Sequence, residues 1–478
     1  MADRPDDLDP RALRGDAPLF DAYLRAVTGH RRSFTIPGHK GRPDLVGPLA
    51  TWDVPLYGGL DEVKQTHGRL AEAERRAAGL WGADFCRFSV GGATHGNQAL
   101  ALAVTRPGEP VVVPRTLHRS LLVGLVLSGA VPVWVRPDVD PELGLPLGVR
   151  ADQVADALAR QPRATAVFTG DPSYVGTIGE TAAVAEVAHR HGIPLVVDAA
   201  WGAHFGFHPR LPAHALGLGA DALVTSVHKA LPGQSQAALV LARTRRIDPG
   251  RLDAAVEATA TTSPAGSTLA SIDASRALLA RDGETLLDAL LDRVARARAT
   301  LIAIDGVRVL AGDDVDPAKL VVLLPGTGAD GNRVERDLLA AGLPVEMADR
   351  DTLVPMLTLA DGDAEVDALV ETIGAAVARH HGPTRKPAGA AAWTVSPVTE
   401  CSPRDAYFAD HLTVPAAEAV GCTSAELVAP YPPGIPVLAP GERITEEALT
   451  ALLAARDSGT RIAYAADPSL STLRVVDR

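Results

Sequence analysis

Short apolar runs alternate with stretches of helical periodicity between about residues 83 and 241 of this 478-residue chain. Nearly every position in these runs is apolar, which is typical of strands buried on both faces of a sheet. The pattern predicts strands at 87–90, 110–113, 131–135, 164–169, 194–198, 222–226 and 237–241. Helices are predicted between them at 96–105, 120–128, 150–160 and 180–190. This alternation predicts an α/β fold with a mainly parallel sheet, in which ligands bind at the carboxyl ends of the strands.

Smaller parts are predicted on both sides of this region. They are a helix at 18–27, a long helix at 274–304, a strand at 320–324, helices at 331–341 and 363–379, and a Pro-, Gly- and Ala-rich linker at 382–397. Asp273 and Arg276 are expected on the solvated face of the long helix. We expect four parts in all, divided as 1–42, 43–273, 274–385 and 386–478.

Composition and charge narrow the class of protein. Lys and Arg number 46 against 58 Asp and Glu, so the net charge of −12 argues against nucleic acid or an anionic membrane as the partner. No apolar run approaches the ~20 residues that cross a bilayer, and the acidic start of the chain does not resemble a secretory signal. We therefore expect a soluble, cytoplasmic protein. Its three cysteines are widely spaced and predict neither a disulfide framework nor a zinc site.

The most informative residues are Asp198, which ends one predicted strand, and Lys229, which closely follows a later one. Pyridoxal 5′-phosphate (PLP) requires such a pair, because a lysine amine bonds its aldehyde and a carboxylate keeps its pyridine nitrogen protonated. Ser226 and His228 flank the lysine with groups able to reach a phosphate. An isolated pair is more often a helix cap and a surface lysine. The SxHK and DxAW contexts favour the cofactor.

Two further segments carry candidate ligand-binding groups. The glycine-rich turn at 89–97 opens a predicted helix, whose backbone amides and Thr94 hydroxyl are suited to phosphate, although such a turn alone is a weak signal. His118 lies just beyond another strand and could stack on a cofactor ring, although an isolated loop histidine is more often a surface residue. His204 and His208 lie in a segment rich in Gly and Pro, so no metal site is predicted.

Several motifs together resemble the Orn/Lys/Arg decarboxylase family in its short bacterial form. They are PGHKG (37–41), GATHGN (92–97), VVPRTLHRSLLVGLVLSGAVPVW (112–134), DAAWGAHFGFHP (198–209), SVHKALPGQ (226–234), TSPAGSTLASIDASR (262–276) and AELVAPYPPGIPVLAPGE (425–442). The resemblance implies an aspartate-aminotransferase-like (type I) PLP fold. It also implies a large PLP-binding domain, a small domain, a C-terminal decarboxylase-family domain, and homodimers or higher oligomers in which the partner completes each site. The loop PGHKG either reaches an active site, which could be a neighbouring subunit's, or forms an exposed turn.

The resemblance also implies the roles of individual residues. Lys229 would bond the cofactor, Asp198 would pair with its pyridine nitrogen, and Lys229 or His228 would return a proton. His118 would stack on the cofactor ring, and Ala200 and Trp201 would line the other face and the edge of that ring. The phosphate contacts would come from Ser226, His228, Thr94 and the Ala93 amide. The positions that depart from the family's usual pattern include Lys64, Thr66, Gly91, Ala93 and His95.

The implied reaction is α-decarboxylation of a basic amino acid to an amine and carbon dioxide. Arginine is favoured over lysine and ornithine, because short bacterial forms of the family are often arginine enzymes. The departures at Lys64, Ala93 and His95 leave an alternative open, in which the same fold acts on a non-basic or modified amino acid as an aminotransferase, lyase or decarboxylase. A decarboxylase-like binding protein without catalysis is disfavoured, because it would need neither Lys229 nor Asp198.

Overall fold

The computed structural model describes residues 15–28, 34–56, 60, 68–140, 142–387, 393–431 and 434–477. The chain forms two compact units, one of residues 1–103 and 198–288 and the other of residues 104–197 and 289–478. Within the described ranges, no helix combines the length and the apolar character needed to cross a bilayer.

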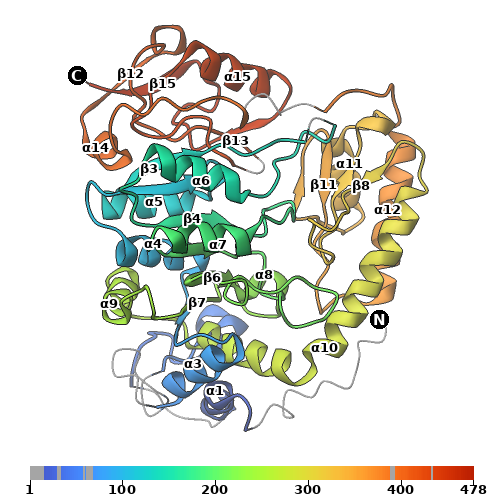
Figure 1. Cartoon of the computed structure of the whole chain (residues 1–478). Helices are drawn as coiled ribbons and strands as arrows, with labels where there is room; N and C mark the ends of the chain where they lie inside the picture. The colour runs from blue at the N-terminus through green and yellow to red at the C-terminus, as the bar shows by residue number, and fades with distance from the viewer. Residues whose placement is uncertain are drawn as a thin grey trace. The chain divides into compact units, whose positions relative to one another are not determined.

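A seven-stranded sheet (Figure 1) contains Asp198 and Ser226, and the other predicted site residues lie in turns or helices that follow its strands. In sheet order its strands are β1 (Phe85–Ser89), β7 (Ala238–Ala242), β6 (Ala222–Ser226), β5 (Leu195–Asp198), β4 (Val167–Gly170), β2 (Pro110–Pro114) and β3 (Val131–Val135). β2 runs parallel to β3 and β4, whereas β7 runs antiparallel to β1 and β6. The predicted α/β class is confirmed, and no predicted strand end is displaced by more than three residues.

The unit of residues 1–103 and 198–288 contains the glycine-rich turn and the two strand ends singled out above. Its helices are α1 (Pro18–Thr28), α2 (Pro43–Val46), η2 (Pro48–Trp52), α3 (Arg69–Leu80), α4 (Gly92–Val104), α8 (Val227–Ala230) and α9 (Pro249–Thr259). Helix α3 packs against α1 and against β1. Helix α4 begins three positions after the end of β1, so its first turn lies near that end of the strand.

The long helix α10 (Gly266–Ile302) begins eight residues before its predicted start at 274. Leu269, Ala270 and Ile272 are fully buried at helical spacing, which explains the longer helix. The expectation for Asp273 and Arg276 is wrong, because both side chains are buried. Asp273 Oδ2 accepts hydrogen bonds from Leu19 N at 2.8 Å and Phe20 N at 3.3 Å, and Arg276 Nη2 donates to Oδ1 at 2.6 Å.

The unit of residues 104–197 and 289–478 contains three groups of elements. The first group comprises the helices that follow strands of the seven-stranded sheet: α5 (Arg119–Ser128), α6 (Ala151–Arg160) and α7 (Thr181–Arg190). The second group is a four-stranded sheet with the strand order β10 (Met347–Ala348), β11 (Thr352–Val354), β9 (Val322–Leu323) and β8 (Arg308–Val309), together with the helices η3 (Pro325–Thr327), α11 (Gly331–Ala340) and α12 (Asp363–Arg379).

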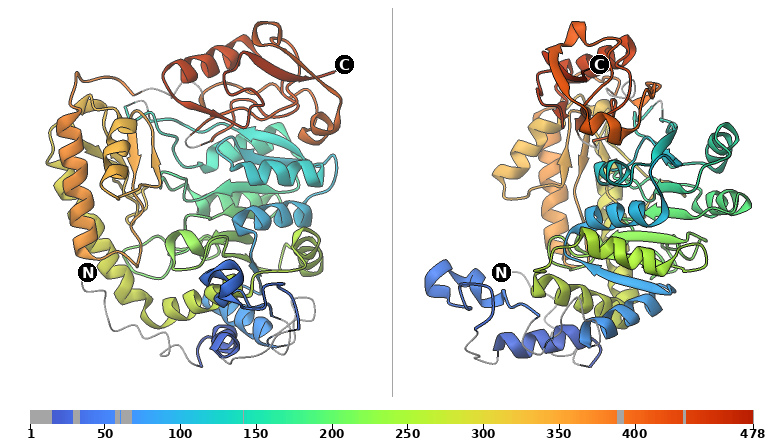
Figure 2. Two further views of the ribbon diagram at one scale, coloured as in Figure 1. Left: turned by 180° about the vertical axis from the view of Figure 1, so that it is seen from behind. Right: turned by 90° about the vertical axis from the view of Figure 1, so that its left-hand side faces the viewer.

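The third group is the C-terminal segment from Trp393 onward, drawn in orange and red in Figure 2, which has an apolar core of its own. Its elements are α14 (Pro403–Phe408), β12 (His411–Pro415), η4 (Ala416–Glu418), β13 (Ala429–Tyr431), α15 (Glu446–Asp457), β14 (Arg461–Ala463) and β15 (Thr472–Val476). β12 pairs with β15, and β13 with β14. Residues 382–387 form no helix or strand, as expected of a linker, and the four-part division of the chain stays a prediction.

Candidate active site

Asp198 ends β5 and is held in place by two hydrogen bonds. Asn97 Nδ2 donates to Oδ2 at 2.6 Å, and Ala200 N donates to Oδ1 at 3.1 Å. Asn97 lies on α4 and is almost fully buried. The carboxylate is therefore oriented from two sides, by a neighbouring helix and by the turn that follows its own strand. A carboxylate held in this way has little rotational freedom left to lose when it binds a ligand.

Helix α4 brings Asn97 close to the sheet because Gly96 has no side chain. A Cβ at Gly96 would lie 2.4 Å from a methyl carbon of Val224 and 3.0 Å from one of Val240. Any larger residue would therefore push the helix away from β6 and β7. The glycine of the GATHGN motif thus has a packing role, and the asparagine beside it orients the predicted catalytic carboxylate.

Lys229 lies on the short helix α8, directly after β6. Its Nζ is 3.9 Å from the centroid of the Trp201 ring, within the range of a cation–π contact. Both side chains are half-buried. The structure therefore brings together the lysine and the tryptophan that were predicted to serve the same site from different strands.

Ser226 and His228 lie on either side of the first residue of α8. Ser226 is 1% exposed, and its Oγ has no hydrogen-bond partner within the part of the chain that the structure describes. His228 Nδ1 is 2.9 Å from the carbonyl oxygen of Ala237, and because a carbonyl only accepts, Nδ1 carries the proton. This bond leaves Nε2 as the ring nitrogen available to a ligand.

Ala93 and Thr94 occupy the first turn of α4. Gly92 has a left-handed φ of 66°, and its amide donates to the Gln236 carbonyl at 2.8 Å. The next amides of a helix have no partner inside the helix, so those of Ala93 and Thr94 are geometrically suited to an anion. Thr94 is exposed, whereas Ala93 is buried.

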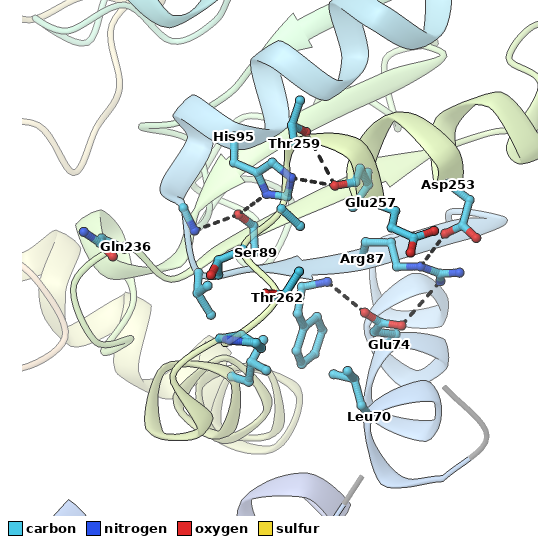
Figure 3. Close-up of a pocket in the computed structure, with 18 residues that line it drawn as sticks. Leu70, Glu74, Arg87, Ser89, His95, Gln236, Asp253, Glu257, Thr259 and Thr262 are labelled. Atoms are coloured by element: carbon cyan, nitrogen blue, oxygen red, sulfur yellow. Dashed lines mark hydrogen bonds and ion pairs between the residues drawn. The ribbon is translucent and has the colours of Figure 1, made fainter. Parts of the chain in front are cut away.

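A pocket of about 440 Å³ lies beside this turn, and the His95 ring lines it (Figure 3). His95 Nε2 is 3.0 Å from the Val256 carbonyl oxygen, so this nitrogen is the donor. Nδ1 therefore accepts the hydroxyl hydrogen of Ser89, whose Oγ is 2.8 Å away. Burial lowers the pKa of His95, which favours the neutral ring with its proton on Nε2. His95 thus connects α4 to both β1 and α9.

His118 lies in the other unit, where it is the N-cap residue of α5. Its Nδ1 accepts a hydrogen bond from the Ser120 amide at 3.2 Å and is 2.7 Å from the Ser120 hydroxyl. The side chain is exposed, and these two bonds fix the orientation of its ring. Ring orientation is the property that a stacking residue must provide.

All the predicted residues except His118 lie in one unit, where contacts join two pairs of them. Asp198 and Ala200 share a hydrogen bond, Lys229 and Trp201 share a ring contact, and Ser226, His228, Ala93 and Thr94 lie on the same two helix starts. Asn97 was not predicted to have a role, although its position in the GATHGN motif, directly after Gly96, was an available signal. Lys64 lies outside the described residues.

The chain is similar to known proteins along most of its length. The pattern of the Orn/Lys/Arg decarboxylase major domain matches residues 17–312, and that of the family's C-terminal domain matches residues 389–462. The arginine decarboxylase of Halalkalibacterium halodurans is 32% identical over 477 residues, which cover 96% of this chain and 97% of that protein.

Solved structures share the fold at lower identity. The lysine decarboxylase LdcF of Francisella novicida superposes with a TM-score of 0.83 at 19% identity, covering 96% of this chain and 81% of that one. A structure of SPT with PLP has a TM-score of 0.57 at 18% identity, covering 77% and 85%. The predicted fold of the type I PLP enzymes is thereby confirmed.

Proposed function

The chain belongs to the Orn/Lys/Arg decarboxylase family, and on that basis we propose that it removes the α-carboxylate of a basic amino acid with PLP as cofactor. The observation that carries the proposal is the constellation around Lys229 and Asp198. A lysine beside an aromatic ring and an oriented carboxylate follow neighbouring strands of one sheet. Membership of the family makes the protein a decarboxylase, and the substrate and cofactor are the parts that we propose.

The residues present fit PLP. Ser226 offers a buried hydroxyl that has no hydrogen-bond partner in the described ranges, and burying such a group without a partner is unfavourable. The first turn of α4 offers the amides of Ala93 and Thr94 to a phosphate, and Asp198 offers a carboxylate to the pyridine nitrogen. When bound, PLP supplies the electron sink for the electron pair left behind by the departing carboxylate.

Each side chain has a definite task in this proposal. Asp198, oriented by Asn97, would keep a proton on the pyridine nitrogen of bound PLP. Trp201 keeps the amine of Lys229 beside an aromatic face, from which the amine can bond the cofactor aldehyde. After carbon dioxide leaves, Lys229 Nζ would return a proton to Cα of the product, or His228 Nε2 would do so from a ring protonated at both nitrogens. The bond from His228 Nδ1 to Ala237 leaves Nε2 free for that transfer.

We propose arginine as the substrate. The support is the arginine decarboxylase of H. halodurans, which matches this chain over nearly the full length of both proteins. The net charge of −12 is compatible with attracting a cationic amino acid.

We also propose that the working form is a homodimer or a higher homo-oligomer. Six large apolar side chains between residues 34 and 52 are more than half exposed: Phe34, Ile36, Leu45, Val46, Leu49 and Trp52. We call these six side chains the apolar arm. An exposed apolar group of this extent is unusual for a monomer and is suited to the surface of a second copy of the chain.

The test combines absorbance, borohydride reduction and carbon dioxide release with arginine, lysine and ornithine in turn. We expect visible absorbance from a cofactor bonded to lysine, covalent attachment at Lys229 after borohydride treatment, and carbon dioxide from arginine. The chain has five lysines, so peptide mapping identifies the labelled one: Lys40, Lys64, Lys229, Lys319 or Lys386. Lys229→Ala should abolish the attachment and lower turnover by at least about 100-fold, whereas the exposed Lys386→Ala should do neither.

The other outcomes are equally informative. Labelling of Lys229 without carbon dioxide from any of the three amino acids would retain the cofactor site and reject a basic substrate. Labelling of another lysine, or no cofactor absorbance after incubation with PLP, would overturn the assignment of the site.

A further inference from the structure

A buried ion pair connects two segments of the family motifs to which no role has yet been given. Arg115 belongs to the segment PRTLHRS and Glu442 ends the segment YPPGIPVLAPGE. Arg115 Nη1 donates to Glu442 Oε1 at 2.5 Å, and Nη2 donates to Oε2 at 2.7 Å. Each side chain is 2% exposed, although the two residues are 327 positions apart. Both lie in the same compact unit.

The surroundings hold this pair in one geometry. Arg115 Nη2 also donates to the Val437 carbonyl at 2.8 Å, and its guanidinium carbon is 4.7 Å from the Trp134 ring centroid. Glu442 Oε2 also accepts the Ala439 amide at 2.9 Å. A bidentate pair of this kind is directional as well as strong, and the same atoms are tied to the backbone of the C-terminal segment.

His118 is only three residues beyond Arg115, and hydrogen bonds hold the intervening turn. The Arg115 amide donates to the Val135 carbonyl at 2.7 Å, and the Leu117 amide donates to the Pro114 carbonyl at 3.1 Å. His118 itself caps α5. A short turn fixed in this way leaves few free backbone torsions between the guanidinium of Arg115 and the imidazole, so a shift of one displaces the other.

The C-terminal segment also contacts both ends of α5. Arg404 Nη1 donates to the carbonyl oxygens of Val126 and Leu127, at 3.1 and 2.9 Å, near the end of that helix. At its start, the guanidinium carbon of Arg119 is 4.8 Å from the ring centroid of Tyr464. The views in Figures 1 and 2 show α14 beside α5. The segment from Trp393 onward therefore holds the element that begins with His118.

We infer that Glu442, through Arg115, is a positioning residue for His118, so that the C-terminal segment sets the orientation of the predicted cofactor-stacking ring. This inference rests on the proposed function, because it assumes that His118 acts on the cofactor. Removing the Glu442 charge leaves a guanidinium buried without its counter-ion, and the Arg115 side chain must then shift toward water. The turn to His118 would move with it.

The test compares Glu442→Gln with Glu426→Gln as a matched control. Glu426 is a buried carboxylate of the same segment, and it accepts the amides of Ala466 and Arg474, both at 2.7 Å. Glu426→Gln should therefore lower the midpoint of thermal unfolding without affecting His118. Glu442→Gln should in addition lower kcat by about 10- to 100-fold, the scale of a small displacement of a catalytic group. It should also alter the visible circular dichroism of the bound cofactor.

Two further measurements separate positioning from general weakening. In a His118→Ala background, Glu442→Gln should change kcat by less than about twofold, because residues that act through one another are not additive. In the cofactor-free protein, the peptide 115–122 should exchange its amide hydrogens faster in Glu442→Gln than in the wild type or Glu426→Gln. Additive losses of kcat, or equal behaviour of the two glutamine variants, would overturn the inference.

The failure of this inference is distinguishable from failure of the proposed function. Labelling of Lys229 and turnover in the wild type test the function alone. If both are observed but Glu442→Gln behaves like its control, only the positioning role is wrong. If His118→Ala keeps full turnover and an unchanged cofactor spectrum, the role of His118 itself is wrong, and the positioning role is overturned with it.

Discussion

His95 departs from the family's usual pattern, and the structure explains how a histidine is accommodated there. Its two ring nitrogens satisfy the Ser89 hydroxyl and the Val256 carbonyl, so a buried polar ring replaces a small apolar side chain without leaving an unpaired group. In the neutral ring, Nε2 donates to the Val256 carbonyl and Nδ1 accepts from the Ser89 hydroxyl. At this position, a histidine therefore stabilises the start of α4, the turn that we assign to the cofactor phosphate.

We predict that His95→Ala lowers the free energy of unfolding by about 1–3 kcal/mol and weakens cofactor binding, because Ser89 and the buried Val256 carbonyl each lose one hydrogen bond. Burial lowers the pKa of His95 in the folded protein below its ordinary value of 6.5. Below pH 6.5 the unfolded chain therefore binds a proton at this histidine more readily than the folded chain does. The stability contributed by His95 is therefore complete above about pH 6.5 and declines as the pH falls. Urea titrations from pH 7.5 to 5 measure this decline. An identical pH dependence in His95→Ala would contradict the prediction.

At the scale of elements, a buried carboxylate organises the loop between β4 and α7. Asp171 accepts the Thr181 hydroxyl at Oδ2 and the Gly179 amide at Oδ1, the latter at 3.1 Å. These bonds connect the end of β4 to the first residue of α7. Burial raises the pKa of Asp171 to about 6. The loop is therefore held by the Asp171 carboxylate, which is charged at neutral pH although its burial makes the charged form unfavourable.

We predict that Asp171→Asn makes the loop less sensitive to pH. Folded Asp171 releases its proton near pH 6, whereas the unfolded chain releases it near 3.8, so the stability contributed by Asp171 falls as the pH rises between these values. Relative to the uncharged Asn variant, the wild type should lose roughly 2 kcal/mol of unfolding free energy between pH 4 and pH 7. Urea unfolding of both proteins across this range measures the difference. Parallel curves would show that burial does not raise the pKa of Asp171.

At the scale of the whole molecule, the apolar arm carries the proposed assembly. Phe34 is 96% exposed and Leu49 83%, values at which neither side chain contributes to the core of its own chain. If a second copy covers them, each side chain contributes about 2 kcal/mol to association. We predict that Phe34→Ser with Leu49→Ser raises the dissociation constant of the oligomer at least about tenfold.

Analytical ultracentrifugation over a range of concentrations measures this constant. Leu339→Ser on α11 is the control, because that leucine is 54% exposed but lies outside the apolar arm. An unchanged oligomer in the double variant, or an equal effect of the control, would show that the apolar arm does not form the interface.

The amino-acid sequence by itself determined the local elements and indicated the proposed chemistry of Asp198 and Lys229. Strands buried on both faces and amphipathic helices produce repeating patterns over short distances, so the seven strands of the main sheet could be predicted within a few residues. Asp198 and Lys229 could be proposed because one ends a strand and the other closely follows one, and the carboxyl ends of parallel strands share one edge of a sheet. The family motifs supported the same assignment.

Contacts between distant residues were decided only by the tertiary structure. The position of Asn97 beside Asp198 depends on how closely α4 packs on the sheet at Gly96. The burial of Asp273 depends on the N-terminal helix that it caps, which lies some 254 positions earlier. Arg115 and Glu442 meet across 327 positions. Hydrophobic periodicity reports which face of an element is buried, whereas a polar partner on another element leaves no periodic trace in either segment.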